Sequence, residues 1–330
     1  MVHWSVGMKT KRFQAGAFVI LAGLAGLLVW QQQAIEDWWR LRNYDAPAAV
    51  ARLASEDTMT SEAERLFYVN HPDITSGGKF ADNCPSGSEK TVVLGCYLSP
   101  DKGIYVYAVT DSRLDGVEQV TAAHETLHAA YRRLSSGERK KVDAMLVNYY
   151  QHGLTDQRVK DTIAAYKKSE PNDVVNEMHS VFGTEVPNLP APLEQYYKQY
   201  FTDRAKVTAY TASYQAEFTG RQDQVAAYDT QLRAMKQQIE ANEAQLDQQK
   251  VAIDNQNQQL QRERDQGQIA AYNSGVAGYN RSVDTYNALL ASTKNLINQY
   301  NAIVAARNAI VLEEQQLAGE LSGTSLPARE

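Results

Sequence analysis

Residues 117–134 read VEQVTAAHETLHAAYRRL, and their pattern is that of a helix with one inward face. Asp115-Gly116 precedes this stretch and Ser135-Ser136-Gly137 follows it, and both are typical helix boundaries. The predicted inward positions recur at steps of three and four, which is the period of an α-helix. They are Val117, Val120, His124, Leu127, His128, Tyr131 and Leu134.

The sequence around this helix predicts a mostly helical globular domain with a small β-hairpin. Two β-branched, apolar runs at 91–97 and 103–109 flank a Ser99-Pro100 turn and read as paired strands. We expect short amphipathic helices within residues 34–70 and further helices at about 138–151, 155–168 and 172–182. Leu189-Pro190 and Pro192 are expected to close this part, which gives a domain over residues 31–203.

The remainder of the chain predicts a long antiparallel helical hairpin, which we place at residues 204–318, with a flexible tail at 319–330. Apolar residues recur every seven positions, which is the coiled-coil repeat. The two rows mirror each other, so a fold near residues 264–265 would set Leu260 beside Ile269. The alternative is a coiled coil between chains. The rows are Phe218, Val225, Leu232, Ile239, Leu246, Ile253 and Leu260, and Ile269, Val276, Val283, Leu290, Ile297, Val304 and Val311.

An uncharged apolar run, FQAGAFVILAGLAGLLVW, occupies residues 13–30. Its length suits a helix that crosses a thin bilayer, and Lys9, Lys11 and Arg12 precede it. By the positive-inside rule, residues 1–12 would be cytoplasmic and the bulk of the chain extracytoplasmic. The sequence therefore predicts a single-pass anchor in the cell membrane, with a cleaved signal peptide as the alternative.

The cysteines and the net charge exclude some classes of protein. Cys84 and Cys96 are the only two cysteines, which excludes a disulfide-dense scaffold. Because the bulk of the chain is predicted to be extracytoplasmic, we expect them to form a disulfide. The net charge of −6 argues against a nucleic-acid partner, because such proteins usually carry a basic surplus.

The predicted helix over 117–134 carries the HExxH motif, His124-Glu125-Thr126-Leu127-His128. A spacing of four sets both imidazoles on one helical face, where they can share one Zn²⁺. The intervening Glu125 would lie beside the metal and accept a proton from its water. A chance match on an ordinary helix is the alternative interpretation.

A hydrolytic zinc site needs a third protein ligand and one open position. Glu177, in the predicted helix at 172–182, is the preferred candidate, with His179 and Glu185 as alternatives. His179, or else Tyr131, is expected to donate a hydrogen bond to the developing oxyanion. His152 has nothing in the sequence to position it.

HETLH with the downstream Asn-Glu-x-x-Ser at 176–180 resembles gluzincin zinc metallopeptidases, the thermolysin-like class. The resemblance implies an α+β zincin-like catalytic domain, zinc at His124, His128 and Glu177, and Glu125 as the general base. It also implies an edge strand that pairs with an extended substrate, a role expected of residues 103–109. Two features depart from that class: a longer separation of His128 from Glu177, and Val181 where an acidic residue is frequent.

The expected function is therefore that of a membrane-anchored, extracytoplasmic zinc peptidase acting on a peptide or protein, with Glu125 and His179 as its catalytic residues. Its hairpin would hold a protein or cell-wall partner. One alternative is a structural or adhesive envelope protein whose hairpin binds partners and whose metal site only stabilises the fold. Another is a hydrolase of cell-wall peptides.

Overall fold

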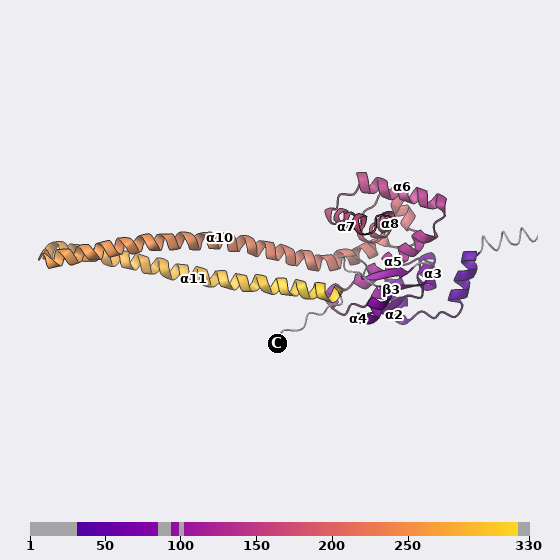
Figure 1. Cartoon of the computed structure of the whole chain (residues 1–330), viewed down its shortest axis with the longest axis horizontal. Helices are drawn as coiled ribbons and strands as arrows, with labels where there is room; N and C mark the ends of the chain where they lie inside the picture. The colour runs from indigo at the N-terminus through magenta and orange to yellow at the C-terminus, as the bar shows by residue number, and fades with distance from the viewer. Residues whose placement is uncertain (1–31, 85–93, 99–101, 323–330) are drawn as a thin grey trace, which may run out of the picture. The chain divides into compact units, whose positions relative to one another are not determined.

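The computed structural model describes residues 32–84, 94–98 and 102–322 (Figure 1). The chain divides into two compact units, the first reaching Tyr214 and the second spanning Gln215–Glu320. Both units are mostly helical, and a small sheet lies in the first, as the sequence predicts. Residues 319–322, expected to begin the tail, belong to the last helix, which continues to Ser322, and residues 323–330 lie outside the described residues.

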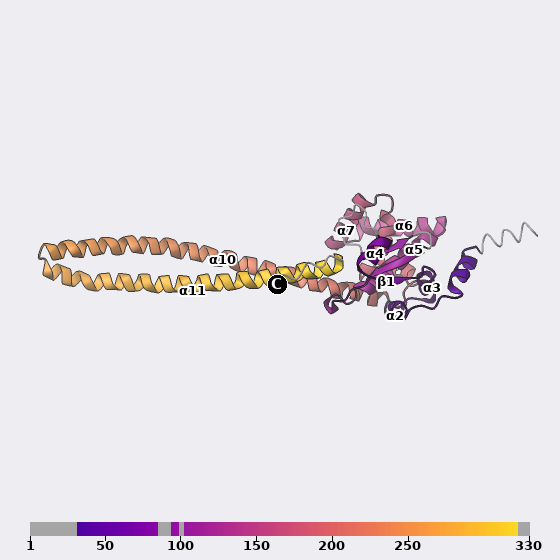
Figure 2. The same cartoon turned by 60° about the horizontal axis from the view of Figure 1, so that its bottom comes forward.

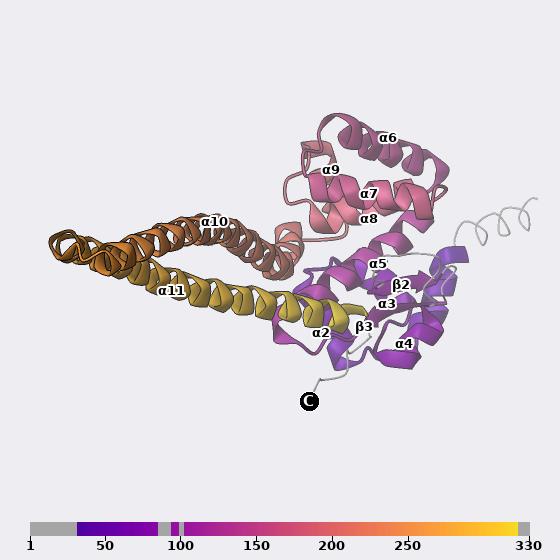
Figure 3. The ribbon, with the colours of Figure 1, turned by 60° about the vertical axis from the view of Figure 1, so that its left-hand side comes forward.

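In the first unit, the other helices and a small sheet surround one central helix, α5 (Figure 3). Four elements of this unit were not predicted: β1, α4, η1 and α9. β1 has only three residues, and α9 carries proline in its first turn, where proline is tolerated and does not end a helix. The elements are α2 Ala48–Glu56, α3 Ser61–Val69, β1 Asp73–Thr75, α4 Gly77–Asn83, β2 Gly95–Leu98, β3 Gly103–Tyr107, η1 Ser112–Leu114, α5 Val117–Arg133, α6 Ser136–His152, α7 Gln157–Ser169, α8 Val174–Glu185 and α9 Ala191–Tyr197.

The sheet has the order β1-β3-β2, with β1 parallel and β2 antiparallel to β3. The expected edge strand at 103–109 is therefore wrong, because β3 is the central strand. The sequence did not reveal the parallel partner, since Asp73–Thr75 is far from β3 along the chain. Among the described residues, β2 pairs only with β3 and lies at an edge.

Helix α5 is buried on nearly all sides, and its most extensive contacts are with α8. It also packs on β2, β3, α2 and α3 (Figure 3). The small residues Ala122, Ala123 and Ala129 are fully buried, which allows these neighbours to approach the helix axis. Gly183 of α8 adds to this close packing, because a Cβ there would lie 2.4 Å from Leu127 Cδ1.

The predicted disulfide is confirmed, since Cys84 and Cys96 are bonded with their Cα atoms 5.9 Å apart. It joins the end of α4 to β2. The edge strand is thereby tied to the helix that precedes it in the chain.

The C-terminal part forms two long helices that pack together, α10 Arg204–Asp265 and α11 Ile269–Ser322 (Figures 1 and 2). Their direction is antiparallel, because Asp229 bonds Arg307 and Asn242 bonds Thr293. The turn lies at Gln266–Gln268, where Gly267 adopts a φ of 69°.

The predicted register of the two helices is wrong. Gly275 contacts Leu260, which the mirrored rows had placed beside Ile269. Ile269 is instead 56% exposed. The position of the turn is set by Gly267, because glycine tolerates a positive φ. The turn therefore lies further along the chain than the symmetry of the apolar rows suggested.

The first residues of α10 belong to the first unit, beyond the expected boundary at residue 203. Arg204 is buried, and its guanidinium donates to the carbonyls of Val186 at 2.6 Å and Pro187 at 3.0 Å. It also pairs with the Glu194 carboxylate. These bonds hold the chain that follows α8 against the start of α10.

The expected single-pass membrane location needs correction. In residues 32–84, 94–98 and 102–322, no helix combines the length and apolar character needed to cross a bilayer. The long helices α10 and α11 are rich in Gln, Asn and charged residues. The segment 13–30, to which the anchor was assigned, lies outside the described residues.

Candidate metal centre

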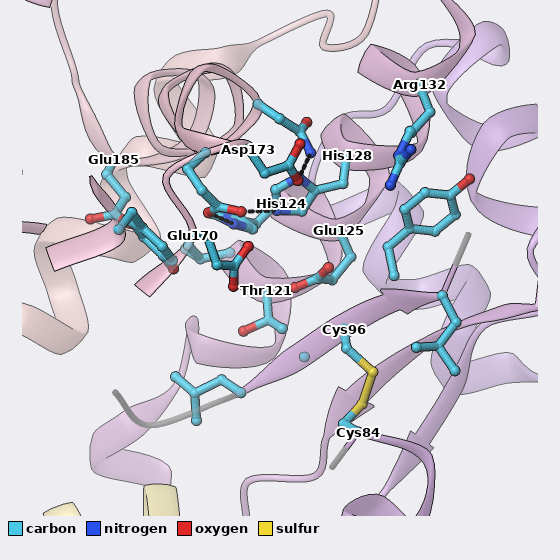
Figure 4. A pocket seen from close by; sticks show the side chains of 18 of the residues that line it. Cys84, Cys96, Thr121, His124, Glu125, His128, Arg132, Glu170, Asp173 and Glu185 are labelled. Atoms are coloured by element: carbon cyan, nitrogen blue, oxygen red, sulfur yellow. Dashed lines mark hydrogen bonds and ion pairs between the residues drawn. A yellow bond between two sulfur atoms is a disulfide. The ribbon is translucent and has the colours of Figure 1, made fainter. Parts of the chain in front are cut away.

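The two motif histidines lie one turn apart on α5, as their spacing predicts. Their ring centroids are 4.7 Å apart, and His128 is 8% exposed. Both side chains line a cavity of about 530 Å³ between α5, β2 and the α7–α8 region (Figure 4).

Helix α8 brings Glu177 to this pair across its contact with α5. The carboxylate Oε1 lies 3.5 Å from His128 Nε2, and Oε2 lies 3.8 Å from His124 Nε2. Burial acts to raise the pKa of Glu177. The adjacent His128, together with His124 and a hydrogen bond from Tyr166, outweighs burial and lowers that pKa overall.

The three side chains fit the donor set of a zinc site. Their ligand atoms all lie within 4.8 Å of one another. Zinc sits roughly 2 Å from each nitrogen or oxygen ligand, so two ligands of one ion are up to roughly 4 Å apart. The separations of 3.5 and 3.8 Å between the Glu177 carboxylate and the two imidazoles fall within that limit. Glu177 Oε2 is also buried with no hydrogen-bond partner in the described part of the chain, although a buried carboxylate oxygen normally has one.

Glu125 lines the same cavity and is 6% exposed. Burial raises the pKa of Glu125 to about 7, with Glu177 adding to the rise, while His128 and a hydrogen bond from the Tyr97 backbone oppose it. A Cβ at Gly95 would lie 3.0 Å from Glu125 Oε1 and 2.4 Å from Thr121 Cγ2. Glycine at this position therefore lets β2 approach the motif helix.

His179 does not lie in the cavity, contrary to the role expected for it. Its side chain is fully buried, and its Nε2 is 2.8 Å from the Tyr196 hydroxyl. Burial, assisted by His128 and His124, lowers the pKa of His179 to about 3, so the ring is neutral. Tyr131, the other expected donor, instead donates a hydrogen bond from its hydroxyl to Asp143 Oδ1 at 2.8 Å.

The alternative ligands are also held elsewhere. Glu185 lines the cavity but pairs with Arg158 at 2.5 Å. His152 ends α6 and is exposed. Of the residues considered from the sequence, Glu177 is thus the one that the fold brings to the histidine pair.

Sequence reasoning missed the acidic residues beside Glu177. Carboxylate oxygens of Glu170, Asp173 and Glu177 lie within 4.8 Å of one another, and all three line the cavity (Figure 4). Their spacing of three and then four was the available signal, since it repeats the period of one helical face. It was hidden because Glu170 ends α7 and Asp173 begins α8.

No protein-family model, curated protein or solved structure matches this chain. The resemblance to gluzincins therefore depends on the sequence motifs alone.

Proposed function

We propose that this protein is a zinc-dependent peptidase that hydrolyses peptide bonds in the cavity beside α5. The observation that carries the proposal is the convergence of His124, His128 and Glu177 next to the buried Glu125, on the wall of a cavity. A metal site that only stabilised the fold would need no adjacent carboxylate and no adjoining space for a substrate.

The ligands proposed for zinc are His124, His128 and Glu177. Zinc bound by them supplies a Lewis acid, which lowers the pKa of water and polarises a carbonyl group. Glu125 accepts the proton of the attacking water and delivers it to the leaving amine. The Tyr97 backbone N–H orients the Glu125 carboxylate for this transfer.

The edge strand β2 supplies a surface for an extended substrate. Tyr107 N–H donates to the Leu94 carbonyl at 2.8 Å, so residues 94, 96 and 98 face β3 by antiparallel alternation. The backbone groups of Gly95 and Tyr97 then face away from β3, and both residues line the cavity. Because the Tyr97 N–H bonds the Glu125 carboxylate, a substrate would meet the Gly95 N–H and carbonyl and the Tyr97 carbonyl. A peptide strand can add to such an edge through main-chain hydrogen bonds.

Zinc binding and cleavage by the purified full chain test this proposal. We expect one tightly bound zinc ion at the histidine pair and hydrolysis of casein or of members of a peptide library. Glu125→Gln should keep zinc and lower kcat by about 10²–10⁴-fold, because it removes the base but none of the ligands. His128→Ala should lose both zinc and activity, whereas His152→Ala, an exposed histidine on α6, should change neither.

Three results would contradict the peptidase assignment. They are absence of zinc binding by the wild-type chain, cleavage by Glu125→Gln as fast as by wild type, and zinc binding without cleavage of any peptide. The last result would favour a structural metal site in a protein that works through its long helices. Peptides from purified cell wall, used as a separate substrate set, distinguish a wall hydrolase from a general peptidase.

A further inference from the structure

The carboxylates of Glu170, Asp173 and Glu177 form an acidic cluster at the junction of α7 and α8. Glu177 also belongs to the histidine site, so the two groups share this one carboxylate. Three carboxylates this close repel one another when ionised, and a cation bound among them would offset that repulsion. If one divalent ion were bound at the histidine pair, the net charge of that ion and the three ionised carboxylates would still be negative.

A separate observation comes from Asn176. This side chain is 4% exposed, lines the cavity and has a buried carbonyl oxygen, Oδ1, with no donor among the described residues. The other end of the same amide, Nδ2, donates to Asp173 Oδ2 at 2.9 Å. The amide group therefore lies at the cluster, and its unpartnered carbonyl oxygen is an acceptor that a cation satisfies.

Asp173 is also turned away from its ordinary local role. It stands at the N-cap of α8, where an aspartate carboxylate usually accepts from the backbone of the first turn. Its side chain makes no such bond and contacts Asn176 instead. The carboxylate is thus available to the cavity and is not used to cap the helix.

We propose that Glu170, Asp173, Glu177 and the Asn176 carbonyl bind a second, hard divalent cation, with Ca²⁺ as the best match, beside the histidine site. All four donors are oxygens, the ligand type that the hard cations Ca²⁺, Mg²⁺ and Mn²⁺ prefer more strongly than softer metals do. Ca²⁺ accepts six to eight oxygens in flexible geometry, which suits three carboxylates and an amide. Glu177 would bridge the two ions, so the proposal extends the zinc site but requires only the oxygen donors.

The test uses the full chain, stripped of metal, saturated with Zn²⁺ and dialysed against Ca²⁺, with Mg²⁺ and Mn²⁺ in parallel. Bound metals are counted by mass spectrometry. We expect one hard cation per chain in addition to zinc. Glu170→Gln, Asp173→Asn and Asn176→Ala should each weaken its binding by about tenfold or more and leave zinc bound.

Two further variants make the result specific. Glu185→Gln removes a carboxylate that lines the same cavity but pairs with Arg158, and it should keep the second cation. His128→Ala should lose zinc and keep Ca²⁺, so failure of the zinc site and failure of the acidic site are distinguishable.

The inference is overturned if the wild-type chain binds none of the three hard cations at about 10 mM, which is above the usual range of protein Ca²⁺ sites. It is equally overturned if Glu185→Gln weakens binding as much as Asp173→Asn. That outcome would mean a diffuse negative surface and no defined site.

Discussion

At the scale of single residues, Asp57 is a buried carboxyl group for which the described residues provide no hydrogen-bond partner. It follows α2, is fully buried, and neither carboxylate oxygen has a hydrogen-bond partner in the described part of the chain. Burial, with Glu56 adding and Lys206 opposing, raises the pKa of Asp57 well above its ordinary value. Its position is imposed by the next residue, since Thr58 has a φ of 53° and bonds to Thr202 and Asp203.

We expect Asp57→Asn to increase the free energy of unfolding by about 1–3 kcal/mol at pH 8. A carboxyl whose pKa is raised in the folded state binds more protons there than in the unfolded state. The wild type therefore loses stability as the pH rises from about 4. The difference between the two proteins should shrink toward pH 4. Urea unfolding at several pH values measures it.

Asp82→Asn, at an exposed position on α4, is the control and should change stability little at any pH. A variant Asp57→Asn that is less stable than the wild type at pH 8 would mean that the charged carboxylate is favourably paired.

At the scale of elements, the contact of α5 with α8 builds the proposed metal centre. HExxH sets two proposed ligands on one helix, and Glu177 reaches them because the two helices approach closely. Gly183 permits this approach, since a Cβ there would be 2.4 Å from Leu127 Cδ1 and 2.8 Å from Tyr197 Cε1. Leu127 precedes His128, so a displacement at this contact moves a ligand.

We expect Gly183→Ala to lower the free energy of unfolding by about 1–3 kcal/mol, because an extra methyl overpacks this contact. It should also weaken zinc binding, since α8 would move away from α5. Gly137→Ala is the matched control: a Cβ there meets nothing within 4 Å, and the helix should gain about 0.5 kcal/mol. Equal behaviour of the two variants in thermal unfolding and zinc titration would contradict this account of the contact.

At the scale of the whole molecule, the pairing of α10 with α11 depends on a few polar contacts within an apolar seam. Leu246 and Thr293 are both buried, and the Asn242 amide donates to Thr293 Oγ1 at 3.1 Å. Polar groups at such positions fix register because other alignments leave them unpaired. The register given by the mirrored rows would set Asn242 at the height of Asn287.

Paired cysteines test this register in the full chain. Under mild oxidation, Asn242→Cys with Thr293→Cys should crosslink within one chain, whereas Asn242→Cys with Asn287→Cys should not. The two registers differ by six residues, or about 9 Å along a helix, which is beyond disulfide reach. Non-reducing gels and thiol counting distinguish the products, and crosslinks formed mainly between chains would indicate an intermolecular coiled coil.

Local patterns determined much of this protein from the sequence. The helical period of 117–134, the seven-residue rows and the HExxH spacing each depend on residues close in the chain, and the structure contains the corresponding helices. The spacing of four sets both histidines on one face whatever packs around them. Glu177 was predicted because a zinc site would need a third ligand from another helix, and α8 places its carboxylate 3.5 Å from His128 Nε2.

Tertiary structure decided which separate elements meet. β1, which lies far from β3 in the chain, makes β3 central and leaves β2 at the edge beside Glu125. Packing buried His179 among tyrosines and gathered Glu170 and Asp173 next to Glu177. Periodicity tells which face of an element is inward, but the partner of that face depends on loop paths and side-chain volumes summed over the whole core.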